Sequence, residues 1–290
     1  MNLIVKTFFD PASHNATHLV CDGESGSCAV IDPVLDLDLA AGRTGTSAAD
    51  RVVEHVSGAG LTVEWILETH VHADHLTAAQ YIKDKLGGRI AIGENVTEVQ
   101  TYFAPIFNLG DSFAADGSQF DHLFTDGDTF RIGGLEARVL HTPGHTPACV
   151  TYVIGDAVFT GDTFFMPDSG TARCDFPGGS ARQLYTSLQK ILSLPPATRM
   201  FINHDYGADG QRDCAWETTV AAQKAENIHV GMATDGVAQD GFVAMREARD
   251  ATLAAPKLLL PALQVNINAG VLPDAAANGI HYLQIPLDRF

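Results

Sequence analysis

The stretch Thr69-His70-Val71-His72-Ala73-Asp74-His75 places three histidines and an aspartate within six residues. It follows the apolar run Trp65-Ile66-Leu67 directly, and this order predicts a buried strand that ends in a metal-binding loop. The first two histidines alternate along an extended backbone, so both imidazoles can point the same way. The aspartate and the last histidine lie just past the turn. One loop can therefore serve one or two cations.

Three later segments offer further ligands, each close to the end of an apolar run. They are His141-Thr142-Pro143-Gly144-His145-Thr146, Phe159-Thr160-Gly161-Asp162-Thr163 and Ile202-Asn203-His204-Asp205. Their candidate ligands are His145, Asp162 and His204. A single short motif counts only in context, and four in order supply that context. Five other histidines stand alone among polar neighbours and are interpreted as ordinary core or surface residues: His14, His55, His122, His229 and His281.

The pattern His-x-His-x-Asp-His, followed by these three segments, resembles the metallo-β-lactamase superfamily along most of the chain. The resemblance implies an α/β fold, the αββα sandwich of two mixed β-sheets flanked by helices. It also implies that His145 is the family's next ligand, Asp162 its bridging carboxylate and His204 its final histidine.

The candidate ligands allow two chemistries, which differ in the number of metals. With two metals, Asp162 bridges a first ion held by His70, His72 and His145 and a second held by Asp74, His75 and His204. A bridging hydroxide then attacks a carbonyl, which gives a hydrolase. With one metal, the ligands are His70, His145 and Asp162. This set of two histidines and one carboxylate leaves open positions and is typical of non-haem iron oxygenases. The other four residues, His72, Asp74, His75 and His204, then form an outer shell.

A segment after Asp162 favours the one-metal alternative. Gly170-Thr171-Ala172-Arg173-Cys174-Asp175-Phe176-Pro177-Gly178-Gly179 is similar to the Arg-x-Asp-Phe segment of persulfide dioxygenases, as are Leu76-Thr77-Ala78, Phe165-Met166-Pro167-Asp168 and Val265-Asn266. The resemblance implies an iron(II) enzyme, with one iron per chain, that uses O₂ to oxidise glutathione persulfide to sulfite and glutathione. Zinc is the expected substitute. The alternatives are a glyoxalase II-like thioesterase with two zinc ions and a non-catalytic metal-binding protein.

In persulfide dioxygenases the residues that match Arg173 and Asp175 lie beside the iron. We expect Asp175 to orient a ligand or Arg173, and Arg173 to offer a fixed positive charge; the alternative is a structural ion pair. Cys174 is a packed small residue or, alternatively, a reactive thiol that exchanges sulfur with the substrate. Tyr206 either lines the pocket or is a packed aromatic residue.

The overall composition limits the partners and the compartment. The formal net charge is −17, which argues against nucleic acid and anionic membranes because both require a basic surface. The five cysteines form no Cys-x-x-Cys pair and are interpreted as reduced thiols. No secretory leader or membrane-spanning run is recognised. We expect a cytoplasmic protein, with a homo-oligomer such as a dimer as its assembly.

The chain is expected to divide into a metallo-β-lactamase-fold domain over residues 1–210 and a C-terminal extension over 211–290 that packs on the sandwich. Helices are predicted from a capping box at Ser47 and Asp50, from about Leu76 to Leu86, from about Asn95 and from about Ser180 to Leu192. In the extension, the segments from Ala215 to Ile228 and from Asp240 to Ala254 are also predicted to be helical.

Overall fold

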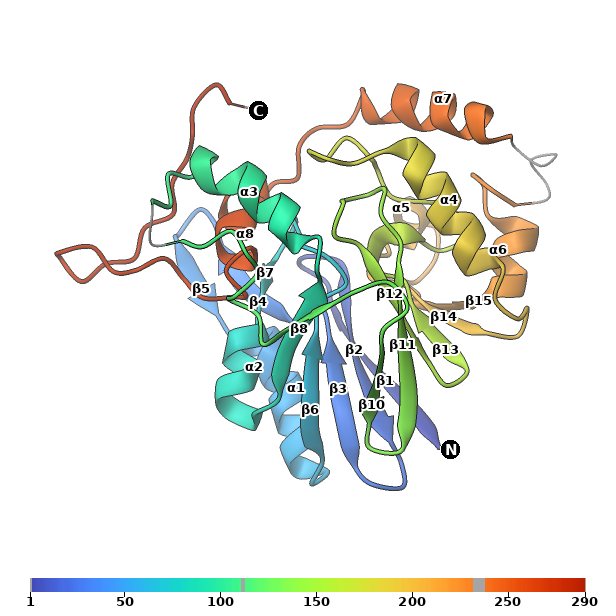
Figure 1. Ribbon diagram of the computed structural model, residues 1–290, viewed down its shortest axis with the longest axis horizontal. Coiled ribbons are helices and arrows are strands. Elements are labelled where there is room, and N and C mark those ends of the chain that lie inside the picture. Colours follow the sequence, from blue (N-terminus) through green and yellow to red (C-terminus); the bar gives the residue numbers. More distant parts are fainter. Residues whose placement is uncertain (1, 111–112, 232–237, 290) are drawn as a thin grey trace.

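The computed structural model of the protein describes residues 2–110, 113–231 and 238–289. Two mixed six-stranded sheets face each other in the middle of the molecule (Figure 1). The first has the order β1-β2-β3-β6-β8-β9: Leu3–Asp10, Asn15–Asp22, Ser27–Ile31, Thr62–Leu67, Arg89–Gly93 and His122–Phe124. The second has the order β10 to β15: Thr129–Ile132, Leu135–His141, Val150–Ile154, Ala157–Phe159, Arg199–Phe201 and Glu217–Thr219.

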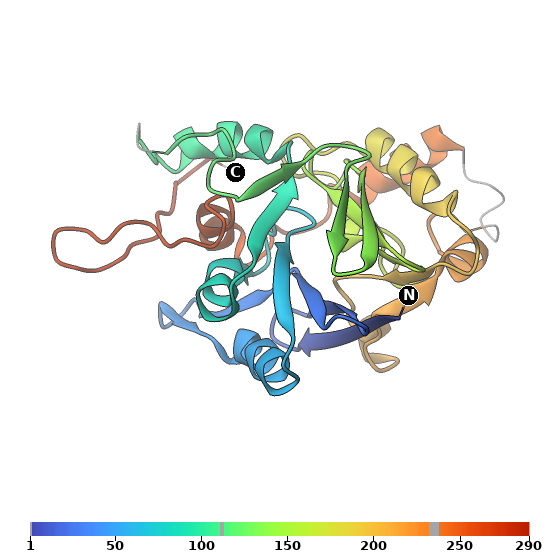
Figure 2. The same cartoon turned by 60° about the horizontal axis from the view of Figure 1, so that its bottom comes forward.

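Helices cover the outer faces of both sheets (Figures 1 and 2). Beside the first sheet lie α1, α2 and α3, which are Ser47–Gly58, Ala79–Leu86 and Val96–Ile106. Beside the second lie α4, α6 and α7, which are Ala181–Leu192, Val220–Glu226 and Gln239–Asp250. The short η1, α5 and α8 are Gly161–Thr163, Gly207–Gly210 and Leu259–Asn266. The predicted αββα sandwich of two mixed sheets is therefore confirmed.

Alternation along the strands explains why the sheets pack in layers. In β3, Ile31 is buried between the two sheets, whereas its neighbour Val30 is buried under the helices. In β6, Leu67 is likewise buried between the two sheets and Ile66 under the helices. Strands buried on both faces read as continuous apolar runs, because successive side chains point to opposite faces. The end of β6 is thereby fixed from both sides where it delivers the metal-binding loop.

A small three-stranded sheet that the sequence did not predict lies beside the first sheet, in the order β5-β4-β7: Arg43–Gly45, Val34–Asp38 and Leu76–Thr77. The helix predicted from Leu76 therefore begins only at Ala79. Leu76 and Thr77 instead pair with Leu35 and Val34 of β4. Pairing with a distant strand overrides the local helical pattern here.

Two further predictions of local structure were wrong in detail. The segment from Ala215 begins as strand β15, which adds to the edge of the second sheet beside β14, and α6 starts only at Val220. The predicted capping box does not form: Thr46, not Ser47, is the N-cap of α1, and its hydroxyl donates to Asp50 Oδ2 at 2.7 Å instead of accepting from a helix N–H.

The predicted extension contributes to the sandwich at several points. It supplies β15, its helix α7 contacts α4, and α8 contacts β7. Met1 and Phe290, the end residues of the two predicted regions, lie outside the described residues. Within the described part of the chain, no helix has both the length and the apolar character required to cross a lipid bilayer.

His18 lies in β2 of the first sheet and forms a hydrogen bond with Ile202, which follows β14 of the second sheet. It is fully buried, its Nε2 donates to the carbonyl of Ile202 at 3.1 Å, and its Nδ1 accepts from the Thr7 hydroxyl at 2.9 Å. Burial lowers the pKa of His18 to about 4. Since the unfolded chain takes up this proton near pH 6.5, the stability that neutral His18 contributes is present above that pH and is lost as the pH falls toward 4.

We predict that His18→Gln reduces the acid sensitivity of metal-free protein. Between pH 6.5 and 4 the wild type should lose about 3 kcal/mol more unfolding free energy than the variant, because the amide that replaces the imidazole does not titrate. Urea unfolding at a series of pH values measures this. Equal losses in the two proteins would show that His18 is not held in its neutral form.

Candidate metal centre

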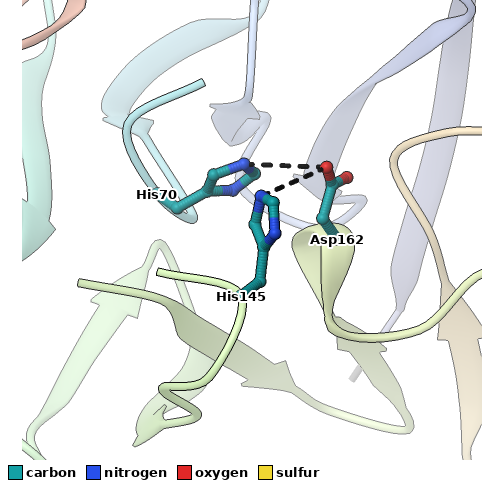
Figure 3. A group of neighbouring side chains, drawn as sticks. All are labelled: His70, His145 and Asp162. Atoms are coloured by element: carbon teal, nitrogen blue, oxygen red, sulfur yellow. Dashed lines mark ion pairs between the residues drawn. The ribbon is translucent and has the colours of Figure 1, made fainter. Parts of the chain in front are cut away.

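Three buried or largely buried groups from different loops converge at one point (Figure 3). His70 follows β6, His145 follows β11, and Asp162 lies in η1 after β13. The Nε2 atoms of both histidines are 3.8 Å from Asp162 Oδ2, and the ligand atoms all lie within 4.8 Å of one another. Ligand atoms about 2.1 Å from a shared cation are themselves roughly 3 to 3.5 Å apart, so a small closure suffices to bind one.

The ring orientation of His70 is fixed by a chain of hydrogen bonds that begins at Asp32. The Thr69 hydroxyl donates to Asp32 Oδ2 at 2.8 Å and therefore accepts from His70 Nδ1, which lies 3.0 Å away. This tautomer leaves the Nε2 lone pair directed at the other ligands. Nε2 is buried and has no hydrogen-bond partner. Burial holds the pKa of His70 well below its usual value, so the ring is neutral and available to a metal.

His145 is oriented by a backbone group instead. Its Nδ1 lies 2.8 Å from the carbonyl oxygen of Arg173. A carbonyl can only accept, so Nδ1 carries the proton and Nε2 presents its lone pair to the centre. Metal-binding histidines commonly donate their other ring N–H to such an acceptor, which fixes both tautomer and orientation.

His204 does not join this group as a ligand but bridges two carboxylates. Its Nδ1 donates to Asp162 Oδ1 at 2.6 Å, and its Nε2 donates to Asp74 Oδ2 at 2.5 Å. Burial alone would lower the pKa of His204, but the charges of Asp162 and Asp74 raise it well above its usual value. The imidazolium thus holds Asp162 in place from the side away from His70 and His145.

A second cluster contains His72, Asp74 and His75, whose ligand atoms also lie within 4.8 Å of one another. His75 Nδ1 donates to the carbonyl of Leu76 at 3.0 Å, and its buried Nε2 has no partner. The imidazole of His72 is not oriented as the two-metal arrangement predicted. Its Nε2 is 3.0 Å from Asp32 Oδ1 and 3.6 Å from Glu68 Oε2, not directed at Asp162.

The donor atoms of the first group fit a borderline divalent cation. Imidazole nitrogen with carboxylate oxygen suits Zn²⁺, Fe²⁺ or Mn²⁺ better than metals that prefer thiolate. The unpartnered, buried Nε2 of His70 is the observation that tests this fit, because a buried nitrogen without a partner otherwise costs free energy.

The segment predicted to resemble persulfide dioxygenases lies against the centre through its backbone. The Arg173 guanidinium binds Asp175 through two hydrogen bonds, of 2.5 and 2.6 Å, and donates to the carbonyl of Ala254 at 2.7 Å. Hydrogen bonding by Arg173 lowers the pKa of Asp175. The Arg173 side chain is thus used in holding the loop, while its carbonyl holds His145.

Cys174 and Tyr206 differ in their exposure. Cys174 is buried, its N–H donates to Asp250 Oδ2 at 2.7 Å, and burial raises its pKa, which disfavours a reactive thiolate. Tyr206 is half exposed, and its ring lies nearly parallel to that of His204, with centroids 6.4 Å apart. A cavity of about 470 Å³ reaches Asp74 and His75 and is lined in part by Ser13 and Arg51.

Sequence reasoning missed the residues that support the ligands. Asp32 accepts from the Thr69 N–H at 2.7 Å, from the Thr69 hydroxyl and from the Asn203 amide. Asp32 could have been suspected, because it ends an apolar strand and precedes a proline. The resemblance to persulfide dioxygenases singled out Val265-Asn266, but the contact of Asn266 with the metal-binding loop could not be predicted, because it lies 194 residues from His72.

Comparisons with known proteins agree with this geometry. The family model described as "Metallo-beta-lactamase superfamily" matches residues 10–204. A probable metallo-hydrolase of Burkholderia pseudomallei is 54% identical over 99% of both chains. The human mitochondrial persulfide dioxygenase ETHE1 is 31% identical over 70% of this chain and 69% of that protein. The crystal structure of ETHE1 from Myxococcus xanthus has a TM-score of 0.73 at 30% identity, over 92% of this chain and 100% of that one. The chain spans only 64% of the beta-lactamase hydrolase-like proteins of Xylella fastidiosa and Agrobacterium fabrum.

Asp162 is a candidate ligand, whereas His204 contacts the centre only through carboxylates, and this difference predicts how much metal each variant binds. Asp162→Ala should abolish tight metal binding, because it leaves two neutral imidazoles. His204→Ala should retain about one metal per chain with roughly 10- to 100-fold lower affinity, because His204 acts on the centre only through Asp162 and Asp74. Elemental analysis and chelator competition measure both variants, with Asp240→Ala as an acidic control that pairs with Arg182. A protein that binds two ions and loses one in His204→Ala would contradict the one-metal arrangement.

Proposed function

Because this chain belongs to the metallo-beta-lactamase superfamily, we propose from its centre that it is an iron(II)-dependent persulfide dioxygenase. Its substrate is glutathione persulfide, its co-substrate is O₂, and its products are sulfite and glutathione. One iron per chain is held by His70, His145 and Asp162. The reaction serves the removal of hydrogen sulfide.

The convergence of His70, His145 and Asp162 is the observation that carries the proposal. Their ligand atoms lie within 4.8 Å of one another and form a set of two histidines and one carboxylate, while both nitrogens of His204 are engaged, one by Asp162 and one by Asp74. Such a set leaves adjacent positions for both a thiolate and O₂. The similarity to the human persulfide dioxygenase ETHE1 and to the Myxococcus xanthus ETHE1 structure supports the dioxygenase activity.

The overall reaction is balanced without further reactants. Glutathione persulfide anion, O₂ and water give glutathione, sulfite and one proton. The sulfur–sulfur bond breaks, the terminal sulfur is oxidised to sulfite, and O₂ is reduced by four electrons. Bound iron(II) would supply the redox chemistry with O₂ that protein side chains lack.

The residues of the chain then provide position and charge. Thr69 and the carbonyl of Arg173 fix the tautomers of His70 and His145. His204 can hold a proton beside Asp162 and the water that the reaction consumes. The cavity that reaches Asp74 and His75 offers room for the peptide part of the substrate.

A glyoxalase II-like thioesterase with two zinc ions is the second candidate. The cluster of His72, Asp74 and His75 favours it, since three donor groups already lie close together beside the first set. The similarity to a probable metallo-hydrolase at 54% identity also supports it. A non-catalytic metal-binding protein is the weakest candidate, because it would need no adjacent cavity. A cytoplasmic location, a homo-oligomer and the absence of nucleic-acid and membrane partners remain part of the proposal.

Metal loading combined with two assays tests the proposal. Protein loaded with iron(II) under anaerobic conditions should consume O₂ when glutathione persulfide is added and release sulfite, whereas zinc-loaded protein should not. The same two preparations are assayed for hydrolysis of a glutathione thioester. Thioester hydrolysis by the zinc form, without oxygen uptake by the iron form, would contradict the dioxygenase proposal in favour of the thioesterase.

Arg173 should affect turnover more than metal content. Arg173→Ala frees Asp175 and the loop whose carbonyl holds His145, and loss of such charge-assisted bonds costs roughly 1.5–3 kcal/mol, or about 10- to 150-fold. We expect catalytic efficiency with glutathione persulfide to fall by that factor while iron content stays near normal. Arg173→Lys keeps the charge but loses the planar fork and should recover only part of the activity. Unchanged efficiency in Arg173→Ala would remove this residue from the site.

A further inference from the structure

Asn266, the last residue of α8, binds the loop that follows β6. Its side chain is buried and makes three hydrogen bonds with the backbone of that loop and of the strand β7 that follows it. Nδ2 donates to the carbonyls of His72 and His75, both at 2.8 Å, and Oδ1 accepts from the N–H of Thr77 at 2.8 Å. A single amide from α8 thus fixes the loop at two carbonyls and the adjoining strand β7 at one N–H.

The loop that Asn266 holds is connected to the metal ligands through Asp74. Asp74 lies between the two carbonyls that Asn266 binds, and its Oδ2 accepts from His204 Nε2 at 2.5 Å. His204 Nδ1 in turn donates to Asp162 Oδ1 at 2.6 Å. A continuous series of contacts therefore runs from Asn266 through the loop backbone, Asp74 and His204 to the carboxylate of the first metal group.

An amide of this length suits the position. Two donors and one acceptor are needed at once, and an asparagine side chain offers both, whereas a carboxylate offers acceptors alone. The helix that carries it is itself fixed, because Ala262 and Val265 of α8 form a buried apolar cluster with Leu76 of β7, directly after the loop. The end of α8 cannot move away from the loop without breaking that cluster.

We propose that Asn266 is a positioning residue of the metal centre, so that α8 is part of the centre although it lies outside residues 10–204. Asn266 holds Asp74 at the distance at which His204 can reach both Asp74 and Asp162. The role concerns how the ligands are held, and it applies to a dioxygenase and to a hydrolase alike.

Gln264 offers a matched control within the same helix. It is also a buried amide, but it holds the C-terminal tail and not the metal loop. Its Nε2 donates to the carbonyls of Leu260 and Gln284, and its Oε1 accepts from the N–H of Gln284. Gln264→Ala therefore removes as many hydrogen bonds from α8 as Asn266→Ala, without touching the loop.

The experiment is a titration of full-length, metal-free protein with Co²⁺, followed by its visible absorption spectrum, which reports ligand number and geometry. We expect Asn266→Ala to bind Co²⁺ about 10-fold more weakly than the wild type, the lower end of the loss typical of outer-shell partners, and to give an altered spectrum. Gln264→Ala should be destabilised toward urea to a similar degree yet retain the wild-type affinity and spectrum.

Asn266→Asp provides the second variant. It keeps the acceptor for the Thr77 N–H but loses both donors, so it should show the same Co²⁺ defect while amide exchange at Thr77 stays slow; it also decides the matter if Asn266→Ala does not fold. Wild-type Co²⁺ affinity and spectrum in the folded Asn266 variants would overturn the proposal. So would an equal Co²⁺ defect in Gln264→Ala, which would trace the effect to general loosening of α8. Because the readout is metal binding, failure of the oxygen-uptake assay leaves this test unaffected.

Discussion

The buried carboxylate of Asp32 is the constraint on which the metal centre depends. Asp32 follows β3 of the first sheet and has a positive φ of 51°. It accepts hydrogen bonds from Thr69 after β6 and from Asn203 after β14 of the second sheet. A carboxylate without exposure to water persists as an anion only when such donors surround it. Burial alone would raise its pKa, but the facing charge of His72 and these bonds hold it below the usual range. One anion therefore fixes the register between two sheets whose loops supply ligands to the same cation.

From Asp32 outward, each ligand is held by a different kind of partner. His70 depends on the Thr69 hydroxyl, His145 on a backbone carbonyl and Asp162 on His204. The loop that supplies the carbonyl is held in turn by α7, where Asp250 accepts from Cys174 N–H and buried Arg246 donates to the carbonyl of Thr171 at 3.1 Å. Holding ligands by separate elements keeps them apart until a cation draws them together. The C-terminal elements thus act on both sides of the centre.

The sequence predicted the layers of the fold and the identity of the residues that converge, but not the contacts that orient them. Apolar alternation and the dense loop after Leu67 are local signals, so β6 and its ligands could be read directly. The strand at Leu76 and Thr77 could not, because it exists only through pairing with Val34 and Leu35. The same limit applies to the direction of His72, which is set by Asp32 forty residues earlier in the chain. Contacts between distant segments depend on topology, which no local pattern contains.

The choice between one metal and two can be reduced to competition at a single nitrogen. The proton on His204 Nδ1 is stabilised by Asp162, and the proton on Nε2 is stabilised by Asp74. A second cation must displace that proton, and because metal ligands bind in their deprotonated form, a raised pKa makes the displacement harder. The same displacement would also release Asp162 from one of its hydrogen bonds and so alter the first site. In the proposed centre, occupancy of the two positions is therefore coupled, because the same histidine contacts Asp162 and Asp74.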